Sequence, residues 1–462
     1  MKQITLLILA CFCMLACRQQ PQTSTAIDIE HYDLPQMKDS GELVVLTLNS
    51  SISYFDYRGE PMGFQYELAK QFAQSLGMKL QVKTAKSTKE MVHMLQQGEG
   101  DLIAYPLPIT KRLKDSILFC GEDIITHQVL VQRNSNKNLK ALTNVTELIG
   151  KHVYVKPGKY LNRLKNLDKE LGGGILIHEV ANDSISLEDL IMQVSNGTID
   201  YTLCDNDLAR LNKTYYTNLN VSLPVSFDQR ASWAVRKTSP LLAEAANQWH
   251  KDNQTSPAYK ASTKRYFENS KRLPHGPILS IKDGKISHFD HLFKKYAPEV
   301  GWDWRIIASL AYNESNFDST AVSWVGAKGL MQLMPRTAKA MGIPEGKEQD
   351  PEESVKAATK YLAQLSRSFS KITDSDEKIK FVLGAYNAGI GHIFDAMALA
   401  EKYGKNKYVW DEHVETFILL KSSEEYFNDP VCKNGYFRGR ETFNFVKDIL
   451  GRAEMYKQKI KD

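Results

Sequence analysis

The residue whose type and position best suit catalysis is Glu314. It follows a segment, residues 304–313, in which apolar residues recur at helical spacing. Glu314 lies four residues after Leu310 and three after Ala311, so its carboxyl group is expected on the apolar face of a helix. Burial raises the pKa of a carboxyl group, which is the condition for a general acid near neutral pH. Two structural alternatives stay open: a buried glutamate held in a polar network, or a helix end turned toward solvent.

Two more blocks follow Glu314-Ser315 in a fixed order. Residues 326–335 read GAKGLMQLMP, and residues 385–389 read AYNAG. Together the three blocks resemble the catalytic domain of soluble-type lytic murein transglycosylases, over about residues 286–457. The resemblance implies a helical, lysozyme-like fold that cleaves the glycan strands of peptidoglycan.

The resemblance also implies a role for each matching residue. Glu314 would protonate the glycosidic oxygen between N-acetylmuramic acid and N-acetylglucosamine, then accept the proton of the muramyl 6-hydroxyl as that oxygen closes a 1,6-anhydro ring. Because the nucleophile belongs to the substrate, the second carboxylate of most glycosidases is unnecessary. Substrate binding would fall to Ser315, Met331, Gln332, Tyr386 and Asn387.

One position departs from the family pattern. Residues 439–446 read GRETFNFV and match a late block that usually ends in Tyr-Val, so Phe445 keeps the ring and loses the hydroxyl. If that hydroxyl normally sets the pKa of the acid or holds substrate, its role is lost or replaced here.

The segments that precede this region follow a different pattern. Residues 43–48, 80–82 and 101–104 are expected as strands that alternate with helices over 63–76 and 88–97, an order that predicts a parallel sheet. A second α/β block begins at residue 152. From about residue 288 onward the pattern is almost entirely helical. The fold class is therefore multidomain, with an N-terminal α/β domain followed by an all-α domain.

The α/β region, residues 40–270, resembles the family 3 extracellular solute-binding proteins. The resemblance is carried by residues 43–46, 63–69, 100–104, 109–112 and 232–237. It implies a bilobed, periplasmic-binding-protein-like fold, with a first lobe at about 40–125 plus 226–268 and a ligand, an amino acid or a muropeptide, in the cleft. Arg112 matches the position that binds the ligand carboxylate, and Asp205 matches the one that receives the ammonium group. The alternatives are a solvated surface arginine and a helix-capping aspartate.

The N-terminus carries a targeting signal. A basic residue and a short apolar run end in Leu-Ala-Cys at residues 15–17, which resembles the lipobox of bacterial lipoproteins. We expect a signal peptide over 1–16, lipidation of Cys17 and a flexible tether over 17–39. The expected location is the periplasmic face of the outer membrane. An ordinary cleaved signal peptide is the alternative. Residues 271–284 are expected as a linker, and residues 285–462 as the catalytic domain.

Composition excludes several partners. The 59 basic and 54 acidic residues of the 462-residue chain leave a net charge of +5, which gives no electrostatic case for nucleic acid binding. Six cysteines and eleven histidines show no metal-ligand spacing, so neither a metal nor another cofactor is expected.

Two other functions compete with the transglycosylase. One is a hydrolytic enzyme with the same lysozyme-like fold, and the other is an envelope binding protein that senses amino acids or muropeptides and carries an inert helical domain. A further hypothesis joins the two domains: a ligand in the cleft would control catalysis.

Overall fold

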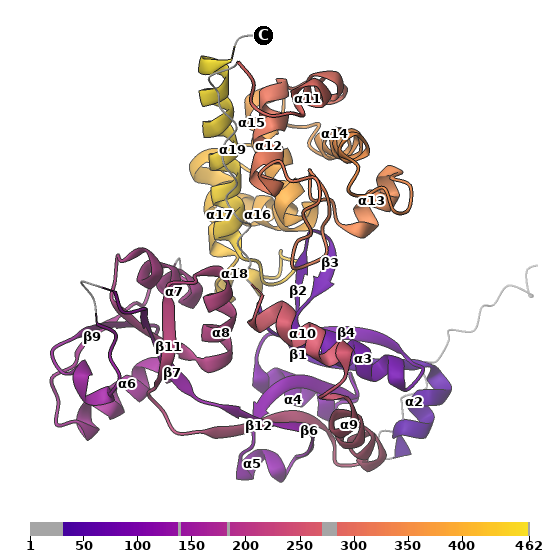
Figure 1. The fold of residues 1–462 in the computed structure, drawn as a ribbon. Coiled ribbons are helices and arrows are strands. Elements are labelled where there is room, and N and C mark those ends of the chain that lie inside the picture. The colour runs from indigo at the N-terminus through magenta and orange to yellow at the C-terminus, as the bar shows by residue number, and fades with distance from the viewer. Residues whose placement is uncertain (1–30, 137–139, 183–184, 270–283, 461–462) are drawn as a thin grey trace, which may run out of the picture.

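The computed structural model describes residues 31–136, 140–182, 185–269 and 284–460. Two α/β lobes lie side by side, and a helical domain stands on both of them (Figure 1). The expected signal peptide, Cys17 and all of the expected linker except residue 284 lie outside the described residues.

Lobe 1 contains a five-stranded sheet in the order β4-β1-β5-β12-β6. β1 pairs in parallel with β4 and β5, which confirms the predicted strand–helix–strand pattern. β12, which was not predicted as a strand, adds an antiparallel neighbour to both β5 and β6. The bounds are β1 Glu42–Leu48, β4 Lys79–Ala85, β5 Leu102–Pro108, β6 Ile117–Thr126, β12 Gln229–Arg236, α3 Phe64–Ser75, α4 Thr88–Gln96, α5 Lys111–Lys114, α9 Pro240–Asn253 and α10 Pro257–Phe267.

Lobe 2 has a second five-stranded sheet, in the order β11-β7-β10-β8-β9. The chain crosses between the lobes twice, from β6 to β7 and from β11 back to β12, as the bilobed fold predicts. The bounds are β7 Gln128–Arg133, β8 His152–Val155, β9 Leu176–Glu179, β10 Tyr201–Asp205, β11 Leu219–Pro224, α6 Lys159–Glu170, α7 Leu187–Asn196 and α8 Asn206–Tyr215.

The last part of the predicted tether is folded. Residues Leu34–Ser40 form helix α2, and the side chain of Met37 is fully buried against lobe 1. The carboxylate of Asp33 accepts hydrogen bonds from the backbone of Leu34, Leu241 and Leu242, so it caps α2 and also fixes the start of α9. The tether can therefore extend no further than the residues that precede α2.

A two-stranded hairpin, β2 Phe55–Tyr57 and β3 Glu60–Met62, projects from lobe 1 into the helical domain (Figure 1). Its turn residues Arg58 and Gly59 both have positive φ, 55° and 78°, which matches the twist of a tight hairpin. The carboxylate of Asp56 accepts a hydrogen bond from the backbone of Gly59 at 2.8 Å.

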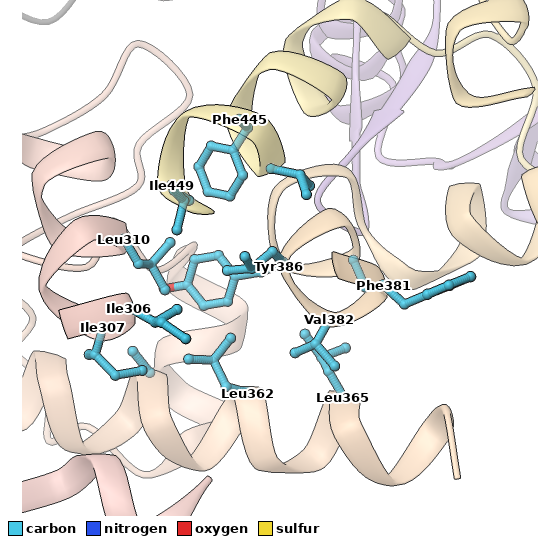
Figure 2. Packing of buried hydrophobic residues seen from close by; sticks show 14 of the residues in the cluster. Ile306, Ile307, Leu310, Leu362, Leu365, Phe381, Val382, Tyr386, Phe445 and Ile449 are labelled. Carbon is cyan, nitrogen blue, oxygen red and sulfur yellow. The ribbon is translucent and has the colours of Figure 1, made fainter. Parts of the chain in front are cut away.

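The helical domain packs around α12 and α19. Figure 2 shows Phe445 and Ile449 of α19 near Leu310 of α12 and Tyr386 of α15, within one apolar cluster. The bounds are α11 Asp290–Tyr296, α12 Trp304–Ser315, α13 Pro335–Met341, α14 Pro351–Ser368, α15 Ser375–Ala388, α16 Ile390–Lys402, α17 Glu415–Leu420, α18 Glu424–Phe427 and α19 Gly439–Lys459.

A separate apolar cluster joins the three bodies. It takes residues from the hairpin and its surroundings, from lobe 2 and from the helical domain, and its buried members are Ile52, Phe55, Met62, Leu211, Tyr266, Phe427 and Tyr436. Apolar burial stabilises contacts by roughly 25 cal/mol per Å² removed from water, so this cluster favours a docked arrangement of the domains.

The described part of the chain contains no helix that is both long and apolar enough to cross a bilayer. Its three cysteines, Cys120, Cys204 and Cys432, are free thiols.

Candidate active site

Helix α12 places Glu314 as the sequence predicts. The Asp303 side chain caps the start of the helix by accepting from the backbone of Arg305 at 2.8 Å, and Asn316 ends it in a left-handed conformation. Glu314 is 5% exposed, on the same face as the buried Leu310 and Ala311. The expectation that its carboxyl group lies on the apolar face is confirmed.

An arginine from the other domain binds this carboxylate. Nη2 of Arg58, at the hairpin tip, lies 3.0 Å from Oε1 and 3.1 Å from Oε2 of Glu314. Its Nη1 donates to the backbone carbonyl of Gln332 at 3.0 Å. The Arg58 side chain is 10% exposed and that of Glu314 is 4% exposed, so the ion pair is largely removed from water.

The hairpin tip fits closely against the AYNAG block. The backbone N–H of Arg58 donates to the carbonyl of Ala388 at 3.3 Å. A Cβ atom on Gly389 would lie only 3.1 Å from the backbone nitrogen of Gly59, so a residue with a side chain would push the hairpin outward. Gly389 therefore permits a close backbone approach by the hairpin.

Two opposing effects act on the acid. Burial has the larger effect and holds the pKa of Glu314 above its ordinary value, although the charge and hydrogen bonds of Arg58 lower it. The guanidinium itself stays charged because Glu314 raises the pKa of Arg58 against the effect of burial. While the hairpin is seated, Arg58 therefore offsets part of the effect of burial and shifts Glu314 toward the carboxylate form, which cannot donate a proton.

Three of the predicted site residues hold the loop that faces Glu314. The Ser315 hydroxyl donates to the carbonyl of Leu330 at 2.7 Å, and the Tyr386 hydroxyl donates to the carbonyl of Met331 at 2.7 Å. The Met331 side chain is fully buried in the core of the helical domain. These contacts fix the backbone of the GAKGLMQLMP block around the acid.

Gln332 and Asn387 keep groups that suit an amide or hydroxyl ligand. Gln332 has φ 48°, and its Nε2 donates to the carbonyls of Ala321 and Gly329 at 3.0 and 2.8 Å. Its Oε1 is buried with no partner among the described residues, so it can accept a hydrogen bond from a ligand. Asn387 Oδ1 accepts from the Thr442 hydroxyl at 2.5 Å.

Phe445 packs as an apolar residue. It is 8% exposed and belongs to the same cluster as Leu310 and Tyr386 (Figure 2). The ring therefore contributes to the packing behind the active site without a hydroxyl.

The two predicted ligand residues of the cleft lie apart. Arg112 is exposed on α5 of lobe 1 and has no hydrogen bond or ion pair among the described residues. Asp205 ends β10 of lobe 2, where it accepts from Lys159 Nζ at 2.5 Å and from the Tyr160 hydroxyl at 3.0 Å. It occupies the N-cap position of α8, but its side chain makes no capping hydrogen bond. Its carboxylate already has a cationic partner within lobe 2.

Within the described ranges, no group of three or more His, Cys, Asp and Glu residues is placed to hold a metal ion.

Comparison with known proteins identifies two families in this chain. Residues 43–269 match the family described as bacterial extracellular solute-binding proteins, family 3, and residues 291–409 match the transglycosylase SLT domain. Among curated proteins, the membrane-bound lytic murein transglycosylase F of Desulfosudis oleivorans is 32% identical over 92% of each chain. The protein of that name from Aeromonas hydrophila is 30% identical over 90% of this chain and 82% of its own.

Among solved structures, two amino acid-binding proteins each match about half of this chain. An ancestral cationic amino acid solute-binding protein matches with 22% identity and a TM-score of 0.43, over 51% of this chain and 99% of its own. A polar amino acid transporter substrate-binding protein from Streptococcus thermophilus matches with 17% identity and a TM-score of 0.44, over 54% of this chain and 94% of its own.

The contact between His392 and the hairpin predicts that the free energy of unfolding depends on pH. His392 is 1% exposed, and its Nε2 lies 3.2 Å from the Asp56 carbonyl, so Nε2 carries the proton. Its Nδ1 is buried with no partner among the described residues. Burial, aided by the charge of Lys421, lowers the pKa of His392 to about 3. Below the ordinary pKa of histidine, the unfolded chain binds a proton at His392 that the folded chain does not bind. The free energy of unfolding therefore decreases as the pH is lowered, by about 2 kcal/mol at pH 5.

Urea unfolding of the wild-type protein and His392→Phe at pH 7.5 and 5.0 measures this effect. The wild-type protein should lose about 2 kcal/mol more than the variant between the two pH values. The other titrating groups are common to both proteins and cancel in the comparison. Equal losses would show that His392 is protonated in the folded state.

Proposed function

We propose that this chain, which belongs to the membrane-bound lytic murein transglycosylase F family and is thus a peptidoglycan lyase, cleaves the β-1,4 bond between N-acetylmuramic acid and N-acetylglucosamine with formation of a 1,6-anhydromuramyl end. The observation that carries this proposal is the buried acid Glu314 at the end of α12, where Ser315 and Tyr386 hold the backbone of the GAKGLMQLMP block.

One carboxyl group suffices for this reaction. Glu314 gives its proton to the glycosidic oxygen as the bond to the muramyl anomeric carbon breaks, and the carboxylate then takes the proton of the 6-hydroxyl as its oxygen bonds to that carbon. Hydrolysis would need a second carboxylate to activate water or form a covalent intermediate. The nearby Asp318 instead accepts from the backbone and hydroxyl of Thr320, at 2.8 and 2.7 Å, in an exposed loop. Asp318 is therefore not placed as a second carboxylate beside Glu314, which favours the intramolecular nucleophile.

The Glu314→Gln variant tests the assignment. An amide of nearly the same shape cannot donate an acidic proton, so turnover of purified sacculi should fall by a factor of about 10² to 10⁴. Mass spectrometry of the wild-type digest should find 1,6-anhydromuramyl ends. Reducing ends instead would indicate a hydrolase, and equal turbidity loss by both proteins would indicate an inert helical domain.

We further propose that the hairpin inhibits catalysis until it withdraws. The Arg58 side chain occupies the space in front of the acid, and its ion pair favours the carboxylate form of Glu314. Withdrawal leaves a buried carboxyl group with no cation, which raises its pKa further and favours the form that donates a proton. The proposed inhibition is thus both steric and electrostatic.

The contacts around Glu188 connect the proposed inhibition by the hairpin to the cleft between the two lobes. Glu188 of lobe 2 accepts from the Ser51 hydroxyl of lobe 1 at 2.7 Å and from the Tyr436 hydroxyl of the helical domain. Arg438 of the helical domain donates to Asn212 of lobe 2 at 2.8 Å. Because the helical domain touches both lobes, a change in the angle between the lobes strains either these contacts or the seat of the hairpin.

The cleft offers space for a regulatory ligand. A cavity of about 420 Å³ lies between the lobes and is closed on one side by the helical domain, with Ser51, Lys156, Glu188, Glu424 and Tyr436 among its lining residues. A ligand, an amino acid or a muropeptide, that binds more tightly when the hairpin is withdrawn would raise the cleavage rate by that difference in affinity. Arg112 and Asp205 remain candidates for its recognition, the latter after release from Lys159.

Loss of the Arg58 side chain should activate the enzyme. A charge-assisted hydrogen bond contributes about 1.5–3 kcal/mol, so Arg58→Ala should raise the cleavage rate of the full chain by about 10- to 100-fold. Arg58→Lys, which lacks the planar donor pair, should give an intermediate rate.

Arg367→Ala is the matched control, since Arg367 is exposed on α14 and makes no ion pair among the described residues. Release of soluble muropeptides from sacculi gives the rate. An Arg58→Ala protein no faster than the control would contradict inhibition by the hairpin.

We also propose anchoring through lipidated Cys17 to the periplasmic face of the outer membrane, where peptidoglycan lies within reach. Relatives are named as membrane-bound. Cys17→Ser should release the protein from the membrane fraction and abolish incorporation of radiolabelled palmitate, whereas Cys120→Ser should change neither. A membrane-bound Cys17→Ser protein would contradict lipid anchoring.

A further inference from the structure

A second cavity lies beside the hairpin, between lobe 1 and the helical domain. It has a volume of about 530 Å³, within the range of small-molecule sites. One wall is β3 and one face of α3, and the opposite wall is the segment that follows Gln332, together with Val325. Neither domain forms the cavity alone.

The charges of the cavity leave cations in excess. Lys70 on α3 and Arg336 on α13 are exposed and have no ion pair among the described residues. The third cation, Arg265, is paired with Glu67 at 2.9 Å. Glu67 also accepts from two hydroxyl groups, at 2.6 and 3.0 Å, so its charge is already satisfied. Glu60 is the other acidic residue of the lining, and the charge of Asp56, which does not line the cavity, also acts on Arg336.

The remaining surface suits a peptide better than a bare anion. Met62, Val325 and Met334 give the cavity an apolar part that matches short alkyl side chains. The amide groups of Gln71 and Gln74 can donate to and accept from peptide groups. A small inorganic anion would use the two cations and leave these surfaces without a partner.

We propose that this cavity binds a short acidic peptide, with Lys70 and Arg336 holding its carboxylates. Peptidoglycan carries short peptides of this chemistry, and naming the cell wall as their source rests on the proposed function. Binding itself does not depend on that function.

Occupancy of the cavity inhibits cleavage. The cavity needs both domains in place, and β3 of the seated hairpin is part of its wall. A ligand that binds only the arrangement with the hairpin seated raises the equilibrium constant for that arrangement by a factor of 1 + [L]/Kd. At a ligand concentration of ten times Kd, the population with a free active site therefore falls about tenfold. Acidic peptides freed from the wall would thus slow further cleavage.

Calorimetry on the full wild-type chain measures binding without turnover, because the dipeptide probes contain no glycosidic bond, and it keeps the ion pair between Arg58 and Glu314 that seats the hairpin. The probe is the dipeptide Ala-Glu, compared with the neutral Ala-Gln and with inorganic phosphate. We expect Ala-Glu to bind at least tenfold more tightly than either. Lys70→Glu and Arg336→Glu should each remove binding, whereas Lys89→Glu, at an exposed position of α4, should not.

A second arm follows cleavage by the wild-type chain at ten times the measured Kd. The rate should fall about tenfold, and Lys70→Glu should abolish this inhibition. Because Lys70 lies in lobe 1, its effect excludes competition inside the active site. Equal binding of phosphate, binding that survives both charge reversals, or binding without inhibition would each overturn the proposal. If the chain is not a transglycosylase, the cleavage measurement would fail and the calorimetric measurement of binding would be unaffected.

Discussion

The buried ion pair between Arg58 and Glu314 is the contact on which the domain arrangement depends. Either charge alone would be costly at such low exposure, because a buried ion without a partner destabilises a protein by several kcal/mol. Each domain therefore supplies the group that the other needs. The pair also explains why the hairpin projects so far from lobe 1: its tip has to reach a carboxylate at the end of α12 (Figure 1).

The rest of the structure holds Arg58 and Glu314 in contact. Positive φ at Arg58 and Gly59 turns the guanidinium toward the acid, and Gly389 leaves room for the backbone beside it. Behind the tip, the shared apolar cluster of lobe 1, lobe 2 and the helical domain supplies non-directional attraction, while the Glu188 contacts are directional. Breaking the directional contacts permits movement without exposing the cores of the individual domains.

The helix faces, buried positions and strands that depend on local periodicity can be predicted from the sequence. The apolar face of α12, the burial of Glu314 and the parallel strands β1, β4 and β5 all follow from spacing along one segment. Arg58 escapes such reasoning because its partner lies 256 residues away and a turn of sequence Tyr-Arg-Gly-Glu has no feature that indicates docking. The antiparallel β12 and the Lys159–Asp205 pair likewise depend on how separate segments meet. The only local signal at the hairpin was a glycine suited to a tight turn.

Burial gives the catalytic acid two properties at once. Removal of water raises the pKa of Glu314 and thus allows it to donate a proton, and the same low dielectric strengthens its attraction for any cation that enters. For that reason an arginine beside Glu314 shifts the carboxyl group toward its charged form without any distortion of the site. The backbone of Gln332 contributes a second acceptor for the same guanidinium, so the loop that would hold the sugar also holds the inhibitor. Under the proposed inhibition, substrate and hairpin compete for one set of polar groups, so that a strand of peptidoglycan enters only when the hairpin leaves.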